Sequence, residues 1–155
     1  MIRLMFVAAL LLSFARPGWA DWQAGQDAAD RGNFQTAINE WRTAAETGDA
    51  RSQFSLGLAY QLGDGVGRDF VAAQKYYLMA AQQGHAGAQV ALGNLCLMGL
   101  GMEKDKVLAY MWFSIAATAD HGMATRKLEK MAGYMSAEEI AQAQLLEQSW
   151  RETHK

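Results

Sequence analysis

The chain has 155 residues, of which 51% are hydrophobic and 19% are charged, and its formal net charge is −2 at neutral pH. This composition excludes an intrinsically disordered chain, and the length suits one domain with a core better than two. A single proline and abundant Ala, Leu, Met and Gln favour helix nearly throughout.

The first twenty residues have the layout of a secretory signal peptide. Arg3 precedes an apolar run at residues 4–12, and small residues stand at positions −3 and −1 of a cut before Asp21. An uncleaved membrane anchor would need ~20 apolar residues, and this run is about half as long before Arg16 interrupts it. We therefore predict a signal peptide at residues 1–20 and no stable membrane insertion after its cleavage.

Cleavage would change the charge of the chain and limit its partners. Loss of Arg3 and Arg16 leaves 12 of the 14 basic residues against 16 acidic ones, a formal charge of −4. This balance offers no basic patch for phosphates, so we expect no nucleic acid partner. Cys96 is the single cysteine, so an exported chain cannot form an internal disulfide and must depend on packing. We expect a periplasmic or secreted protein of a Gram-negative bacterium.

The rest of the chain repeats itself at a spacing of 36 residues. Residues 50–85 and 86–121 align position by position: each contains a Leu-Gly pair, a Gly-x-Gly link, an Asp, two adjacent aromatic residues and an Ala-Ala pair. A fixed period of this length is the signature of a solenoid, in which each repeat buries its apolar face against its neighbours. The period therefore predicts two full repeats at these residues.

Each repeat is expected to hold two antiparallel helices. In the first helix, apolar residues recur on one helical face, and Cys96 falls at the buried position that Tyr60 takes one period earlier. Gly57 and Gly93 lie inside these helices, where glycine costs roughly 1 kcal/mol against alanine. A cost repeated at one position predicts that the second helix crosses there too closely for a Cβ atom.

The link and the second helix carry turn and capping signals. Gly63 and Gly99 are expected to end the first helices with a positive φ. Asp69 and Asp105 stand near the start of the second helices, where an acid stabilises the N-terminus. We interpret the aromatic pair that follows as core, packed between small Ala faces.

Incomplete repeats are expected at both ends of the domain at residues 21–155. Residues 21–49 form a partial repeat, and residues 122–155 begin with a degenerate first helix. A capping box at residues 136–139 opens a last helix, at residues 137–152. We expect this helix to seal the end of the stack through Ile140, Ala143, Leu146 and Trp150. The predicted fold is all-α: a short right-handed α-solenoid of antiparallel helix pairs with a capping C-terminal helix.

These residues resemble the Sel1-like repeat family, a relative of the tetratricopeptide repeats. The resemblance runs from about residue 22 to the last helix, and the second repeat departs from the family pattern at Cys96, where the family has Tyr, and at Asp120, where it has Gly. The resemblance implies an adaptor whose first helices line a concave face that holds a protein or peptide. Some cysteine-rich relatives are described as penicillin-binding or β-lactamase-like, but they have a disulfide in each repeat, so we do not transfer that activity.

Catalytic and metal-binding motifs do not stand out. His85 and His121 occupy equivalent loop positions. Neighbouring repeats lie ~10 Å apart, which is too far for the two histidines to share one metal ion, so we interpret both as solvated loop residues. The methionines from Met79 onward are scattered over several elements and are interpreted as core filler. We predict no catalytic residue, no cofactor and no metal.

A binding surface is expected where the repeats differ while the scaffold positions agree. The candidate partner-binding face comprises Arg51, Phe54, Ser55, Leu58, Gln61, Val90, Asn94 and Leu97. An apolar groove with a few amides suits an extended peptide or a partner helix. An equally weighted alternative is that Phe54 and Leu58 pack on the preceding helix pair.

The sequence therefore predicts a non-catalytic periplasmic interaction module, an adaptor for a protein or peptide of the cell envelope. Two alternatives stay open. One is a cell-envelope enzyme that acts on peptidoglycan or a β-lactam, and the other is a self-assembling structural protein, since a short solenoid could continue its stack with a second copy. No particular oligomeric state is predicted.

Overall fold

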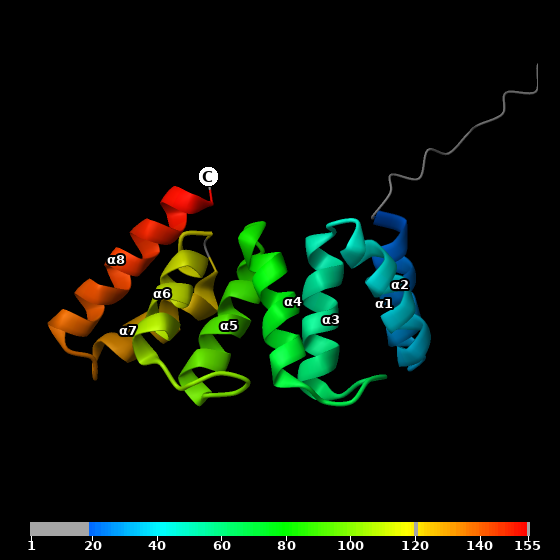
Figure 1. Cartoon of the computed structure of the whole chain (residues 1–155), viewed down its shortest axis with the longest axis horizontal. Coiled ribbons are helices and arrows are strands. Elements are labelled where there is room, and N and C mark those ends of the chain that lie inside the picture. Colours follow the sequence, from blue (N-terminus) through cyan, green and yellow to red (C-terminus); the bar gives the residue numbers. More distant parts are fainter. Residues whose placement is uncertain (1–18, 120, 155) are drawn as a thin grey trace, which may run out of the picture.

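The computed structural model describes residues 19–119 and 121–154, which form an elongated row of eight helices (Figure 1). The predicted signal peptide falls outside the described residues except at its last two positions. The helices are α1 (Trp19–Asp30), α2 (Phe34–Glu46), α3 (Ala50–Leu62), α4 (Phe70–Gln82), α5 (Ala86–Met98), α6 (Lys106–Ala117), α7 (Gly122–Ala132) and α8 (Ala137–Thr153). None of these helices is long and apolar enough to cross a membrane.

The helices pack in pairs along the row. The first six form the pairs α1–α2, α3–α4 and α5–α6, and the second helix of each pair also packs on the first helix of the next. The core is therefore drawn out along the stack, and it divides into two clusters, one over the first repeats and one over the last. The prediction of an all-α solenoid of helix pairs is confirmed.

A glycine of the first helix receives an aromatic ring of the second helix. A Cβ atom at Gly57 would lie 2.5 Å from Cδ1 of Tyr77, and one at Gly93 would lie 2.5 Å from Cε1 of Phe113. Both rings are fully buried. The predicted close crossing is confirmed, and it is the ring rather than the backbone of the second helix that occupies the place of the missing side chain.

The first pair of helices contains the same contact, which the sequence comparison missed. A Cβ atom at Gly25 would lie 2.4 Å from Cδ1 of Trp41, a ring that stands one period before Tyr77. Gly25 is not in register with Gly57, because the turn between α1 and α2 is shorter than the later links. The 36-residue spacing therefore predicts the position of the Trp41 ring but not that of Gly25.

The links tie neighbouring repeats together. Gly63 and Gly99 end α3 and α5 with φ of 86° and 71°, as predicted, in the left-handed region that favours glycine. Further along the first link, a Cβ atom at Gly65 would lie 2.8 Å from the carbonyl carbon of Phe34. Gly101 is equally close to the first residue of α4. Each link therefore packs on the first turn of the second helix of the repeat before it.

The predicted helix caps are present. The carboxylate of Asp69 accepts hydrogen bonds from two backbone N–H groups of α4, at 2.9 and 3.0 Å, and Asp105 accepts one from α6 at 2.9 Å. Ser136 and Glu139 form the capping box of α8, each side chain accepting from the backbone N–H of the other. Such caps satisfy donors that have no partner inside their own helix.

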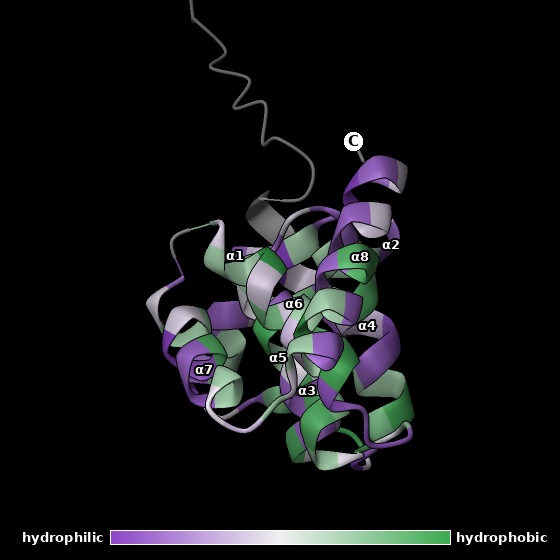
Figure 2. Ribbon diagram, turned by 90° about the vertical axis from the view of Figure 1, so that its left-hand side faces the viewer, coloured by the Kyte–Doolittle hydropathy of each residue, from purple (hydrophilic) through white to green (hydrophobic). Residues whose placement is uncertain are grey.

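The last helix caps the stack by packing on the second helix of the last full repeat. It packs on α6 and does not pair with α7, and in Figure 2 α7 and α8 stand on opposite sides of the stack. Ala143 is buried, and Ile140 and Trp150 are half-buried against the core, but Leu146 is 40% exposed. α8 therefore lies at the end of the stack, as expected, and it covers α6 there (Figure 1).

α7 lacks the glycine that α3 and α5 contain. Glu129 stands one period after Gly93, so α7 offers no glycine to receive an aromatic ring. The ring of Trp150 in α8 instead packs edge-on against Trp112 of α6, with the centroids 4.8 Å apart. Without the glycine contact the fourth pair does not form, and α8 takes the apolar surface of α6.

The glycine contact can be tested by adding one methyl group. Gly93→Ala is expected to lower the free energy of unfolding by about 1–3 kcal/mol, because the methyl must displace the buried ring of Phe113. The matched control is Gly122→Ala at the start of α7, where a Cβ atom meets nothing within 4 Å. There we expect no loss of stability. Urea unfolding followed by circular dichroism measures both, and equal stabilities would contradict the role of the glycine.

Candidate functional site

One face of α3 and α5 is not covered by the second helices. It consists of side chains at equivalent positions of the two repeats, spaced three and then four residues apart on each helix. We define this open stripe as Ser55, Leu58, Leu62, Ala91, Asn94 and Met98. Three of its large apolar members are strongly exposed: Leu58 at 40%, Leu62 at 56% and Met98 at 55%.

Three residues of the predicted partner-binding face lie on the open stripe: Ser55, Leu58 and Asn94. Leu58 is 40% exposed and lines a pocket together with residues of α1, so it lies beside the preceding helix pair without being buried by it. Leu62 and Met98 were missed, although each stands four residues after a stripe residue, the spacing of one helical face.

Four other predicted residues pack inward. Val90 is 5% exposed within the core, so it cannot contact a partner and we do not carry it into the proposed face. Leu97 is half-buried against the same core. Gln61 accepts a hydrogen bond from the hydroxyl of Tyr77 at 2.7 Å, and the ring of Phe54 lies 5.7 Å from the ring of Tyr77. Phe54 therefore packs on the second helix of its own repeat and not on the preceding pair.

The eighth predicted residue, Arg51, lies where α1 meets the open stripe. Its guanidinium lies over the ring of Trp22, 4.4 Å from the centroid, and its Nη2 is 3.4 Å from a carboxylate oxygen of Asp49. The indole N–H of Trp22 donates to the hydroxyl of Ser55 at 3.3 Å. These contacts hold α1 against α3 and fix one wall of the stripe.

A pocket of about 250 Å³ opens between α1 and α3 beside the stripe. Leu58, Leu62 and Trp41 supply apolar surface, and the carboxylates of Asp30 and Asp64 line the same space. An apolar cavity with a few polar groups is typical of a binding site, and carboxylates at its border favour a cationic neighbour. The pocket can therefore hold an apolar side chain that is followed or preceded by a basic one.

Cys96 is part of the core. Its Sγ is buried and lies 3.1 Å from Sδ of Met102, and burial raises the pKa of the thiol to about 12. A thiol with such a pKa stays protonated at neutral pH and is a poor nucleophile. Its counterpart Tyr60 is half-buried, with its ring stacked on Tyr76 at 5.6 Å. The interpretation of Cys96 as a small core residue is confirmed.

His85 is an N-cap and not a solvated loop residue. Its Nδ1 accepts a hydrogen bond from the backbone N–H of Ala88 at 3.2 Å, and its ring stacks on Phe54 with the centroids 4.6 Å apart. Burial lowers the pKa of His85 below its ordinary value of 6.5, and this outweighs the opposing effects of a backbone hydrogen bond and of Asp49. His121 begins α7 at the equivalent position but makes no capping bond.

No metal site is found at these histidines. Across residues 19–119 and 121–154, no group of three or more His, Cys, Asp or Glu side chains could hold a metal ion.

The comparisons with known proteins agree with this geometry. The model of the Sel1 repeat matches residues 50–85 and 86–121. A protective antigen present in uropathogenic Escherichia coli strains, which displays an SLR fold, matches with a TM-score of 0.83 and 33% sequence identity, over 88% of this chain and 30% of the antigen. A Sel1 repeat protein from Oxalobacter formigenes matches with a TM-score of 0.67 and 33% identity, over 72% of this chain and 47% of its own. No curated protein matches the sequence.

The helix pairs and the open stripe define an α-solenoid repeat protein of the kind that typically acts as a scaffold for protein interaction. The chain belongs to the Sel1 repeat family. It spans between about a third and a half of the length of the two solved relatives.

The capping role of His85 predicts a dependence of stability on pH. Because the pKa of His85 is lower in the folded protein than in the unfolded chain, the unfolded chain takes up a proton at higher pH. The stability from this group is present above the unfolded pKa of 6.5 and declines as the pH falls below it.

His85→Asn keeps an N-cap side chain that does not titrate, so the free energy of unfolding should depend less on pH between about pH 7.5 and about pH 5.5. Urea unfolding at each pH measures the slope. His154→Asn is the control, since that exposed side chain caps no helix N-terminus. An equal slope in wild type and His85→Asn would contradict this assignment.

Proposed function

We propose that this protein is a non-catalytic interaction module that binds a protein or peptide on the open stripe. The exposure of Leu58, Leu62 and Met98 on a rigid scaffold carries the proposal. Neighbouring large apolar side chains exposed together commonly mark an interaction site. The other faces of α3 and α5 are held by the glycine contacts and the links, so the stripe is free to vary without loss of the fold.

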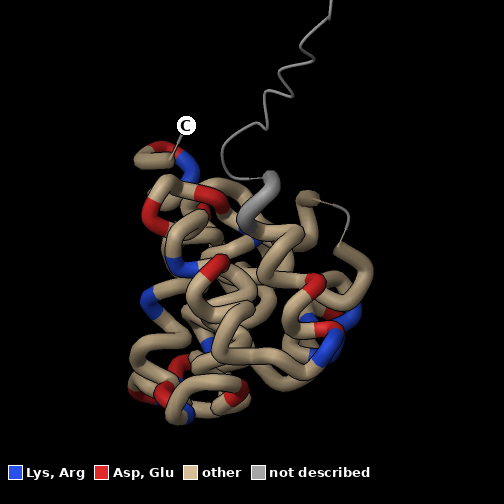
Figure 3. The backbone as a smooth tube through the Cα atoms, turned by 90° about the vertical axis from the view of Figure 1, so that its right-hand side faces the viewer, with Lys and Arg blue, Asp and Glu red and all other residues tan. Residues whose placement is uncertain are grey.

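The charges along the stripe support a partner of defined polarity. Asp30 and Asp64 line the pocket beside α3, while Lys127 and Lys130 of α7 stand one period after two residues of the stripe. Figure 3 shows acidic and basic residues interspersed over the backbone as seen from the α1–α2 end. We propose that an apolar side chain of the partner enters the pocket beside a basic group, and that an acidic segment lies near α7.

We also propose that the protein is exported and meets its partner in the cell envelope. The support is the layout of residues 1–20 and the absence of a membrane-spanning helix among the described residues. The Escherichia coli relative is a protective antigen, which agrees with a location outside the cytoplasm.

Removing two apolar side chains from the stripe tests the binding face. A photocrosslinking residue at position 62 should capture the partner in cells, which allows the pair to be reconstituted from purified proteins. Leu62→Gln with Met98→Gln should weaken that complex about tenfold or more, since a buried anchor contributes at least ~1–2 kcal/mol. The melting temperature of the double variant alone should equal that of the wild type, because both side chains are already more than half exposed.

The matched control is Val71→Gln with Leu145→Gln, two apolar residues that are 63% and 67% exposed on α4 and α8. Equal affinity of the two double variants for the partner would show that the open stripe is not part of the interface. Turnover of a muropeptide or a β-lactam, lost on one point substitution, would favour the enzyme alternative. A dimer that the Leu62 variant dissociates in sedimentation would favour self-assembly.

If the protein is exported, removal of residues 1–20 fixes the mass of the mature chain. Intact mass spectrometry of the periplasmic fraction should find a chain that begins at Asp21. Ala20→Arg, which places a large charged residue at position −1, should leave the precursor uncleaved. Gln23→Arg, beyond the cut, serves as the control. A full-length chain in the cytoplasm would contradict the proposal.

A further inference from the structure

A buried glutamine connects each full repeat to the helix pair before it. In the first repeat, Gln53 is 3% exposed, and its Nε2 donates to the carbonyl oxygen of Ala45 at 3.2 Å. Its Oε1 accepts a hydrogen bond from Nε2 of Gln83 at 2.7 Å. Both ends of this buried amide are therefore satisfied within the chain.

The second repeat keeps the glutamine but lacks its partner. Gln89 stands one period after Gln53, is 4% exposed, and donates to the carbonyl oxygen of Ala81 at 3.3 Å. Its Oε1 is buried and has no hydrogen-bond partner among the residues that the structure describes. The residue one period after Gln83 is Ala119, which has no side-chain donor. A buried carbonyl without a donor is costly, so it indicates a place for one.

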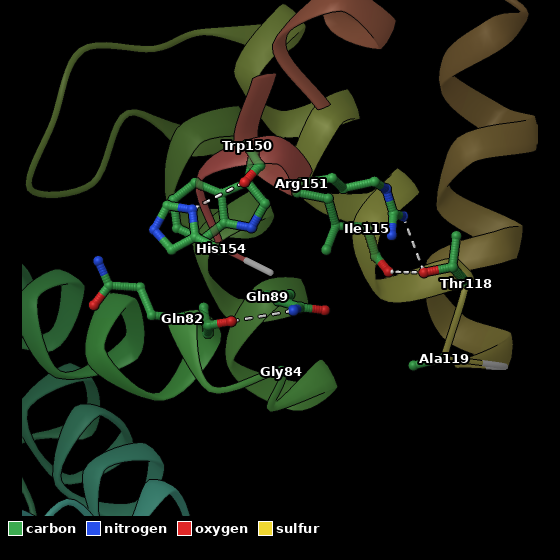
Figure 4. Close-up of a pocket in the computed structure, with 10 residues that line it drawn as sticks. Gln82, Gly84, Gln89, Ile115, Thr118, Ala119, Trp150, Arg151 and His154 are labelled. Atoms are coloured by element: carbon green, nitrogen blue, oxygen red, sulfur yellow. Dashed lines mark hydrogen bonds between the residues drawn. The ribbon is translucent and has the colours of Figure 1, made fainter. Parts of the chain in front are cut away.

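The missing side chain coincides with a pocket of about 430 Å³ (Figure 4). Gln89, Thr118 and Ala119 line it, together with the C-terminal part of α8. In Figure 4 the amide oxygen of Gln89 points away from its bond to Ala81, towards the side on which Thr118 and Ala119 lie. The acceptor without a donor is therefore directed towards this pocket and lies just beneath its wall.

The opposite wall offers a donor. Arg151 donates through Nη2 to the hydroxyl of Thr118 at 3.1 Å and to the carboxylate of Glu147 at 2.7 Å, and through Nε to the same carboxylate at 2.9 Å. Its Nη1 makes no hydrogen bond within the described part of the chain. Because Glu147 already neutralises the guanidinium, a neutral carbonyl suits this position better than a second carboxylate.

The remaining wall is flat and apolar. The rings of Trp150 and His154 stack at 3.6 Å between centroids, and Ala81 and Ile115 line the same space. Such a surface suits the small side chains and the planar group of a peptide. Trp150 and Arg151 reach this place because α8 lies across α6 and its last turn ends beside the α4–α5 turn.

We propose that this pocket is a second binding site, which takes one unit of peptide backbone. The ligand donates a backbone N–H to Oε1 of Gln89 and accepts from Nη1 of Arg151 through a neutral carbonyl. A peptide unit is the common group that carries one such donor and one such acceptor in a single plane. The site lies apart from the open stripe, so it stands whether or not the stripe binds a partner.

A blocked dipeptide tests the site directly. Acetyl-alanyl-alanine methylamide, titrated at millimolar concentration into isotope-labelled protein, should shift the side-chain amide resonances of Gln89. The analogue methylated at every backbone nitrogen has no N–H to donate and should bind about tenfold more weakly or worse. Equal binding of the two peptides, or no shift at Gln89, would overturn the proposal.

Ala119→Gln is expected to restore the missing partner and to fold. Its amide should donate to Gln89 as Gln83 does to Gln53 and fill the pocket, so that peptide binding falls at least tenfold while the melting temperature is maintained or rises. Gln83→Ala is the control: it removes the donor from the first repeat, lowers the melting temperature and leaves binding at Gln89 unchanged. Peptide binding by Ala119→Gln at wild-type strength would overturn the assignment.

Discussion

The contact between a glycine in one helix and an aromatic ring in the next is the constraint on which the rest of the structure depends. Gly57 and Gly93 give up helix stability so that Tyr77 and Phe113 can lie against the helix backbone. Because the rings are buried there, each pair has one spacing and one orientation. The links and caps then position the next pair on that fixed unit, and the stack grows by repetition.

The same constraint explains where the repetition ends. Glu129 occupies the glycine position in α7, so no aromatic ring can enter and α8 takes the surface of α6. The position of α8 on α6 has two consequences for binding. One side of α7, which a paired second helix would cover, has no such helix on it. Trp150 and Arg151 are brought to the end of the second repeat.

Comparing the repeats separates structural residues from those available for binding. Leu62 and Met98 lie at equivalent exposed positions, and neither is required by the glycine contacts or by the links. Gln89 presents the opposite case, a structural residue whose partner has been replaced by Ala119. The two proposed binding sites therefore have different origins. The open stripe is surface that takes no part in helix packing, and the pocket at Gln89 contains an acceptor whose hydrogen-bond donor is missing.

The sequence by itself determined the helix pairs, the glycines of the two full repeats, the caps and the family, because those features depend on contacts at short range that recur every 36 residues. It also pointed to Leu58, which is exposed, and to Ser55 and Asn94, which are half-exposed. Tertiary structure alone decided that Val90 is buried and that α8 turns away from α7, since both depend on packing between elements distant in the chain. The pocket at Gln89 belongs to the same class: it requires a residue from α5, the end of α6 and the last turn of α8 together, which no repeat pattern specifies.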